Sequence, residues 1–176
     1  MDYSDLTGLQ GQDNQGGLTQ IIYYAPTSYF QVIQDFNPTP EIPGVLEIAT
    51  AHTFKSGKGF HTAYATLDTA KMMMELTGER DGKGYAPKIE FFHPGTKKQA
   101  AGFARQCKND QFIVLAPNPN GYVFQVGTKN IFAEISAKYD SGTLSSGRNG
   151  WTFEVNSYAN GMIFYDGNIV LYPTAP

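Results

Sequence analysis

The side chains most able to do chemistry are three histidines and one cysteine. His52, His61 and His93 form no HxxxH or HxH pair, and no Asp or Glu lies at metal-ligand spacing beside two of them. The sequence therefore predicts no metal site. It favours separate strand-end or surface positions for the three histidines.

Cys107 is the only cysteine, so the chain can form neither an internal disulfide nor a cysteine metal cluster. It would act as a nucleophile only if His93 lay beside it. It continues the apolar stripe of an expected helix, which is a typical place for a small buried thiol. We therefore expect a structural role for Cys107.

Two glycine-rich strings, at residues 56–59 and 81–84, superficially suggest phosphate-binding loops. Neither has the GxxxxGK[ST] pattern or joins a clean strand to a helix, so both are better explained as hairpin tips. Two acids from distant strands could converge for glycoside hydrolysis, but no pair stands out in the sequence. The residues thus predict no catalytic site and no cofactor.

The elements that would position these side chains are mostly β-strands. Short β-branched and aromatic runs alternate with turns rich in Gly, Pro, Asn and Asp, and Asn120-Gly121 predicts a tight hairpin. The pattern predicts a mainly β protein, a sandwich or half-open barrel of about nine strands. The apolar runs lie at 21–24, 29–33, 45–48, 60–66, 88–92, 112–115, 122–126, 131–137, 151–155, 162–165 and 169–172.

One segment has helical periodicity. Ala100, Phe103, Ala104 and Cys107 fall at i, i+3, i+4 and i+7, and Thr96 can serve as the N-cap. We expect one α-helix over about 96–108, flanking a sheet. Residues 67–77 are ambiguous, because they could form a short helix capped at Asp68 or a strand or long loop; we favour the second alternative.

Composition narrows the class of protein. Of 176 residues, 41% are hydrophobic, 14% are aromatic and only 16% are charged, against roughly 25% charged in a typical soluble domain. This balance excludes disorder and argues against a coiled coil, and no apolar run approaches the roughly 18 residues of a membrane span. A surface so short of charge suits burial by another subunit.

The expected organisation is a flexible, glycine-rich N-terminal arm at 1–17 and a single β-rich domain at 18–176. Within that domain we expect a long inserted loop or hairpin at about 50–87. The arm would gain order only by packing on something else.

Charge is distributed unevenly along the chain. Residues 1–54 contain six acids and neither Lys nor Arg, whereas all thirteen cations follow from Lys55 onward. This is either chance combined with a polar arm, or a pair of complementary surfaces that favours head-to-tail association. The residues we expect at contacts between subunits are Ile21, Tyr23, Asp35, Glu47, Lys58, Lys83 and Arg148.

Several short sequence segments between residues 78 and 165 resemble the tail tube proteins of tailed bacteriophages. They are GERDGK at 78–83, FFHPGT at 91–96, GFA at 102–104, NDQFIVL at 109–115 with its Asn120-Gly121 turn, and SGT…SGRNG at 141–150 followed by Phe153-Glu154. The similarity is one of general pattern and carries no catalytic motif.

The resemblance implies a β-sandwich or half-open barrel with a flanking helix, and a structural role without a reaction. Six copies would close a ring, inner sheets would merge into one barrel, and rings would stack into a tube for DNA ejection, bridged by loops and the arm. The haemolysin-coregulated protein of type VI secretion shares this architecture. If the acidic residues of the first part of the chain faced the lumen of the tube, they would repel the DNA and keep it sliding.

The implied partners are further copies of the chain and other tail proteins: a terminator, a tape measure, a baseplate, and a sheath if the tail is contractile. Phage DNA would pass without specific binding, since no Lys/Arg cluster is interleaved with aromatics. The implied location is the virion, after assembly in the bacterial host cytoplasm. Two alternatives stay open: a carbohydrate-binding or -cleaving module, such as a baseplate or receptor-binding domain, and another tail ring component, such as a terminator or hub.

Overall fold

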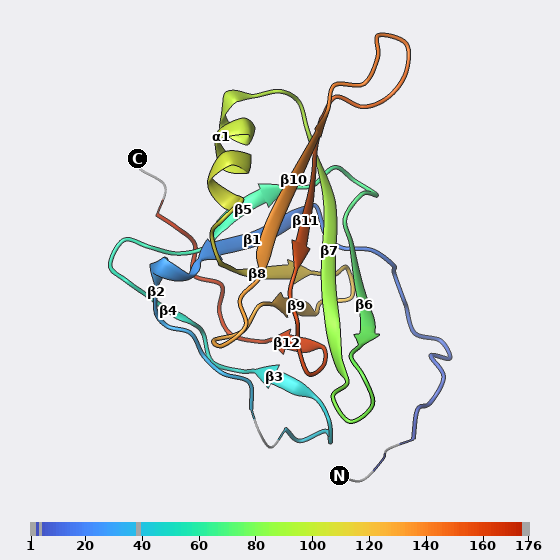
Figure 1. Ribbon diagram of the computed structural model, residues 1–176. Helices are drawn as coiled ribbons and strands as arrows, with labels where there is room; N and C mark the ends of the chain where they lie inside the picture. Colours follow the sequence, from blue (N-terminus) through green and yellow to red (C-terminus); the bar gives the residue numbers. More distant parts are fainter. Residues whose placement is uncertain (1–2, 4, 38–39, 174–176) are drawn as a thin grey trace.

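The computed structural model describes residues 3, 5–37 and 40–173 and shows a mainly β protein with one α-helix (Figure 1). Strands account for 40% of the structure and helices for 8%. The predicted fold class is confirmed. The described residues form twelve strands, more than the expected number, because very short strands such as β4 (Thr53–Phe54) are added.

The larger sheet has six strands in the order β3-β12-β9-β8-β1-β5. Only β3 and β12 run parallel; the other neighbours are antiparallel. The predicted hairpin at Asn120-Gly121 is confirmed: it joins β8 to β9, and Asn118 N donates to Tyr122 O at 2.8 Å. The strands are β1 (Ile21–Pro26), β3 (Leu46–Ile48), β5 (His61–Tyr64), β8 (Phe112–Pro117), β9 (Val123–Val126) and β12 (Ile163–Tyr165).

The smaller sheet has four antiparallel strands in the order β10-β11-β7-β6. These are β6 (Lys71–Thr77), β7 (Gly84–Pro94), β10 (Glu134–Asp140) and β11 (Gly150–Asn156). A separate pair joins β2 (Phe30–Val32), which follows the 3-10 turn η1 (Thr27–Tyr29), to β4.

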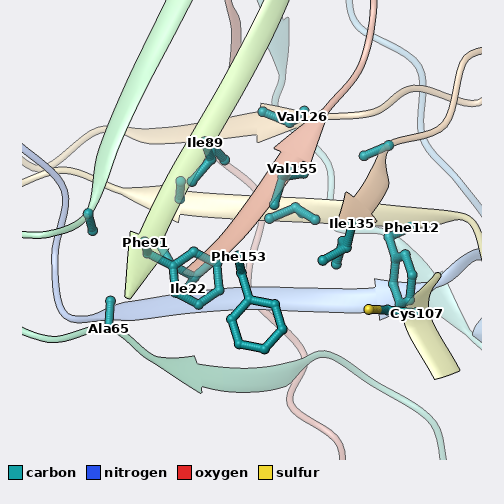
Figure 2. Close-up of a cluster of buried hydrophobic side chains, with 14 residues drawn as sticks. Ile22, Ala65, Ile89, Phe91, Cys107, Phe112, Val126, Ile135, Phe153 and Val155 are labelled. Carbon is teal, nitrogen blue, oxygen red and sulfur yellow. The ribbon is translucent and has the colours of Figure 1, made fainter. Parts of the chain in front are cut away.

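The main core lies between the six-stranded and four-stranded sheets (Figure 2). Phe91 of β7 and Phe153 of β11 stack with ring centroids 5.4 Å apart. Because side chains alternate along a strand, the residues between these buried positions face away from the core. The larger buried members are Ile22, Val114 and Val126 from the six-stranded sheet and Ile89, Phe91, Ile135, Phe153 and Val155 from the four-stranded sheet.

A second core covers the opposite face of the six-stranded sheet, beneath the β2–β4 pair. It includes Phe30, Phe60, Ile113, Leu115 and Tyr165. Strand β8 is therefore buried on both faces, which explains its continuous apolar sequence.

The helix α1 spans Lys98–Cys107, within the predicted range of 96–108. The predicted N-cap is wrong: Lys97 occupies that position, and no side-chain hydrogen bond caps the helix. After β7 the chain turns at Gly95, with φ of 92°, and needs an extended residue at Lys97 before the helix can begin. Lys97 O accepts from Ala100 N and Ala101 N instead.

Residues 67–77 form a turn and a strand, as the favoured alternative predicted. Asp68 has φ of 64° in a turn closed by Thr69 N donating to Thr66 O at 3.2 Å, so it caps no helix. The methionine triplet at 72–74 lies within β6, which pairs with β7 along its whole length.

The segment at 50–87, expected as an inserted loop or hairpin, contributes β4, β5, β6 and the start of β7 to three different sheets. The run at 169–172 forms no strand; Leu171 makes only a single bridge with Phe60. Of the expected arm, residues 1, 2 and 4 lie outside the described residues. The arm is anchored where Gln15 and the Asn120 side chain exchange two hydrogen bonds, of 3.0 and 3.1 Å.

Candidate functional site

The two expected contact residues on β1 differ in exposure. Ile21 is 44% exposed and lies opposite Tyr64 of the neighbouring β5, which is 48% exposed. Tyr23 is half-buried and packs against the second core. Strand β1 lies between β5 and β8, so its backbone is not an edge of the sheet.

The two expected acidic contact residues lie in the segment around β3. Asp35 is exposed, and its Oδ1 accepts from Phe36 N at 3.1 Å. Glu47 is half-buried on β3 and shares a hydrogen bond with Asp166. Partial burial raises the pKa of Glu47, and the hydrogen bond to Asp166 and the negative charges of Asp166 and Glu41 raise it further.

Lys58 is held by aromatic rings from both ends of the chain. Its Nζ lies 4.7 Å from the Tyr29 ring centroid and 5.5 Å from that of Tyr172. The His61 ring stacks on Tyr172 at 4.4 Å, and burial and the charge of Lys58 lower the pKa of His61. Cation–π contacts of this kind orient the ammonium group. No local sequence signal could reveal this cluster, because Tyr29 and Tyr172 are far apart in sequence.

Lys83 and Arg148 lie at opposite ends of the four-stranded sheet. Lys83 is exposed in the turn between β6 and β7. Arg148 is exposed in the loop at 141–149, and its guanidinium carbon lies 5.8 Å from the Phe92 ring centroid. This loop projects far from the body of the molecule (Figure 1) and carries the fully exposed Leu144. The structure therefore does not gather the seven predicted contact residues into one site.

The three histidines lie in different parts of the fold: His52 packs against Phe60 of the second core, and His93, near the end of β7, contacts Tyr64 O through Nδ1 at 2.9 Å. His61 lines a groove beside α1 together with Cys107. In the residues that the structure describes, no group of three His, Cys, Asp or Glu side chains could hold a metal ion. Cys107 is buried, its thiol donates to Ala104 O at 3.5 Å, and burial raises its pKa, which makes it a poor nucleophile.

His52 belongs to a buried polar network that the sequence did not indicate. Its Nδ1 accepts from Gln34 N at 3.0 Å, so Nε2 carries the proton and donates to Gln125 Oε1 at 2.9 Å. Gln125 Nε2 donates to Gly127 O at 2.9 Å. Tyr165 Oη accepts from His52 N and donates to Asn168 O. The network is fully satisfied, as a structural role requires.

Two of the grooves on the surface bear on function. One of about 800 Å³ lies along the outward side of the four-stranded sheet, where Glu75, Lys88 and Glu134 line it. Another of about 660 Å³ lies beside β9 and β12. Its lining includes Glu47, Asp166, Tyr122, Phe124 and Phe164.

No protein-family model, curated protein or solved structure matches the chain. No helix in the described part is long and apolar enough to cross a bilayer.

Proposed function

We propose that this chain is a structural virion protein that assembles into hexameric rings, which stack into the tube of a phage tail and conduct DNA during ejection. The observation that carries the proposal is the pair of open edges on the four-stranded sheet. Strands β6 and β10 each have seven residues, and neither has a second neighbour among the described residues. Long unpaired edges are a liability in a monomer and are removed when copies pair.

Exposed apolar side chains on projecting segments also support assembly. Leu6 is 99% exposed and Leu9 is 55% exposed on the N-terminal arm, and Leu144 is exposed on the loop between β10 and β11. These segments extend from the sandwich in different directions (Figure 1). In stacked rings they would contact neighbouring copies and become covered.

The proposal includes no reaction and no cofactor. The partners are further copies of the chain, the other tail proteins named above, and DNA that passes without specific binding. A heterologous contact between identical copies closes a ring when its rotation allows, and otherwise gives an open filament.

Electron microscopy and light scattering of the purified chain test this function. We expect rings or tubes that increase with protein concentration. A stable monomer at high concentration over a range of salt would refute the proposal. A single ring that never stacks would favour another ring component, such as a terminator.

A carbohydrate-binding module is the second candidate, because the groove beside β9 and β12 places the Glu47–Asp166 pair among Tyr122, Phe124 and Phe164. Glycoside hydrolases keep their two carboxyl groups about 5–9.5 Å apart, whereas these two share a hydrogen bond. The groove therefore suits glycan binding better than cleavage. Glycan binding that is lost in Tyr122→Ala, without assembly in electron micrographs, would favour this candidate.

A further inference from the structure

The directions of the two open edges are compatible with each other. Neighbouring strands alternate in direction across the four-stranded sheet, so β6 and β10 run in opposite directions. A second copy placed alongside in the same orientation brings its β10 antiparallel to β6 of the first copy. The alternation of the sheet then continues across the contact.

On both edges, every second residue directs its backbone N–H and C=O away from its own sheet, and these residues can be placed opposite each other. Ala70, just before β6, accepts from Leu18 N on the open side at 3.1 Å. Ala133, just before β10, exchanges hydrogen bonds of 2.8 and 2.9 Å with Phe112, on the side away from β11. Backbone groups alternate in direction along a strand. Every second residue from these points therefore directs its N–H and C=O outward: Met72, Met74 and Leu76 on β6, and Ile135, Ala137 and Tyr139 on β10.

The equal lengths of β6 and β10 favour the register in which the two strands begin and end together. With both seven-residue strands flush, Met72 lies opposite Tyr139, Met74 opposite Ala137 and Leu76 opposite Ile135. Ile135, Ala137 and Met72 already belong to the main core or pack against it, so the contact extends that core from one copy to the next.

Charge favours the flush register over one of its two neighbours. On the outward face, Lys71 lies opposite Asp140, and opposite charges across a strand pair are stabilising. A shift of two residues in one direction sets Lys71 opposite Lys138. A shift in the other direction sets Glu75 opposite Lys138, but it leaves Lys71 and Met72 without a partner in β10, so strand length and not charge disfavours it.

We propose that β6 of one copy pairs with β10 of the next copy in this flush antiparallel register. This inference rests on the proposed function, because it names the contact through which copies join. The pairing covers Leu76 and Tyr139, which are 58% and 41% exposed. It also encloses the edge of Trp151, which packs on Tyr139 with ring centroids 5.1 Å apart and whose buried Nε1 has no partner.

The flush register also fixes the tilt of the joined sheet. Within one copy Ser136 lies level with Lys71, through Glu154 and Glu90. In the contact, Asp140 of the next copy takes that level, so each copy is offset by four residues, about 13 Å. Each copy contributes four strands, so the register offset is one residue per strand. The strand tilt of a closed barrel depends on this ratio. An eight-stranded barrel with a shear of 8 has the same ratio, and its strands tilt by about 36°.

Disulfide trapping tests the register. In a Cys107→Ala background, the pair Glu75→Cys with Ser136→Cys places two thiols opposite each other across the contact. The matched control, Glu75→Cys with Lys138→Cys, is shifted by two residues. Within one copy these positions lie on opposite edges, roughly 14 Å apart across the sheet and displaced along the strands by at least four residues, about 13 Å, which is too far for a disulfide. Links can therefore form only between copies.

Under mild oxidation at assembling concentrations, the flush pair should give a ladder of linked chains on a non-reducing gel, on the order of tenfold faster than the control. The ladder should end at the number of copies in a closed ring. Circular dichroism should show that both variants fold, since all three positions face outward.

Three other outcomes are possible, and each would refute a different part of the proposal. Faster linking of the control pair refutes the register. Tubes in electron micrographs without links in either pair refute the β6–β10 contact while the proposed function stands. Absence of both assemblies and links refutes the function and the contact together.

Discussion

The two sheets of the sandwich differ at their edges. In the six-stranded sheet, Phe60, just before β5, exchanges hydrogen bonds of 2.8 and 2.9 Å with Val170 and Tyr172, and Glu47 O on β3 accepts from Asn37 N at 2.7 Å. Both edge strands there are short and partly covered by other segments. The edges of the four-stranded sheet are longer: Leu18 and Phe112 bond only to the residues just before β6 and β10, and α1 lies beside β10, but neither seven-residue strand has a second neighbouring strand among the described residues. Since uncovered edges invite pairing, the chain protects one sheet and leaves the other available for assembly.

The largest expected effect comes from blocking an open edge with proline. In Leu76→Pro, the exposed side chain changes and the outward N–H of β6 is lost, so the fold should persist while pairing fails. We expect the concentration needed for assembly to rise by on the order of tenfold or more, measured by light scattering. The matched control is Thr62→Pro, at an exposed outward position of β5.

Thr62→Pro should leave assembly unchanged, provided that circular dichroism shows both proteins folded. If the two prolines weaken assembly equally, the difference between the sheets has no role in assembly. If only Thr62→Pro weakens it, the six-stranded sheet forms the contact.

The next effect concerns the covered edge at β5. A Cβ at Gly59 would lie 2.4 Å from the backbone carbon of Leu171, so this glycine allows the C-terminal segment to reach the sheet. Gly59→Ala should lower the free energy of unfolding by about 1–3 kcal/mol in urea denaturation. Gly102→Ala on α1 is the control, because nothing lies within 4 Å of a Cβ there. It should stabilise the protein by about 0.5–1 kcal/mol. A Gly59→Ala protein as stable as the parent would show that the segment can move away at no cost.

Stability should depend on pH through His52, which is buried with Gln125 beside the second core, and more weakly through the half-buried His61. Burial lowers the pKa of His52 below its ordinary value of 6.5, so the unfolded chain binds the proton more readily. Stability is therefore complete above about pH 6.5 and falls as the pH decreases toward the folded-state pKa, by at most about 1.4 kcal/mol per pH unit. Urea midpoints between pH 7.5 and 5 measure this. His52→Gln should flatten the dependence, and an unchanged slope would assign it to another group.

Local features were predictable from sequence, and long-range ones were not. The Asn120-Gly121 hairpin depends on two adjacent residues, and the stripe at Ala100 to Cys107 marks α1 because helical contacts are local. Residues 67–77 stayed ambiguous, since methionines suit either a helix or a strand and pairing with β7 decides.

The contacts expected between subunits stay a prediction. Within one copy, tertiary packing places Tyr23 against a core and Lys58 between aromatic rings, which no local sequence pattern indicates. The His52 network joins residues 73 and 113 positions apart, for which a single sequence carries no signal.

The smallest expected effect comes from reversing single charges. It tests whether copies attract each other through the acids near β3 or through the charged residues on the edges of the four-stranded sheet. Three of the five described acids in residues 1–54, namely Asp35, Glu41 and Glu47, lie near β3, on the six-stranded sheet's side. Lys71 and Asp140 lie on the open edges of the other sheet. Lys71→Asp should weaken assembly by about 0.2–1 kcal/mol, a few-fold change in the assembling concentration, and most strongly at low salt.

Adding Asp140→Lys to Lys71→Asp should restore assembly, because the swap recreates the opposite charges in the flush register. Lys71→Asp also removes the 3.7 Å contact with Glu90 inside one copy, and the second substitution cannot repair that loss. Rescue in light scattering therefore reports the contact between copies alone. Reversal of Asp35 and Glu47 to lysine is the counterpart on the other sheet. If that variant, and not Lys71→Asp, alters the salt dependence of assembly, the complementary surfaces follow the uneven charge along the sequence and not the edges of the four-stranded sheet.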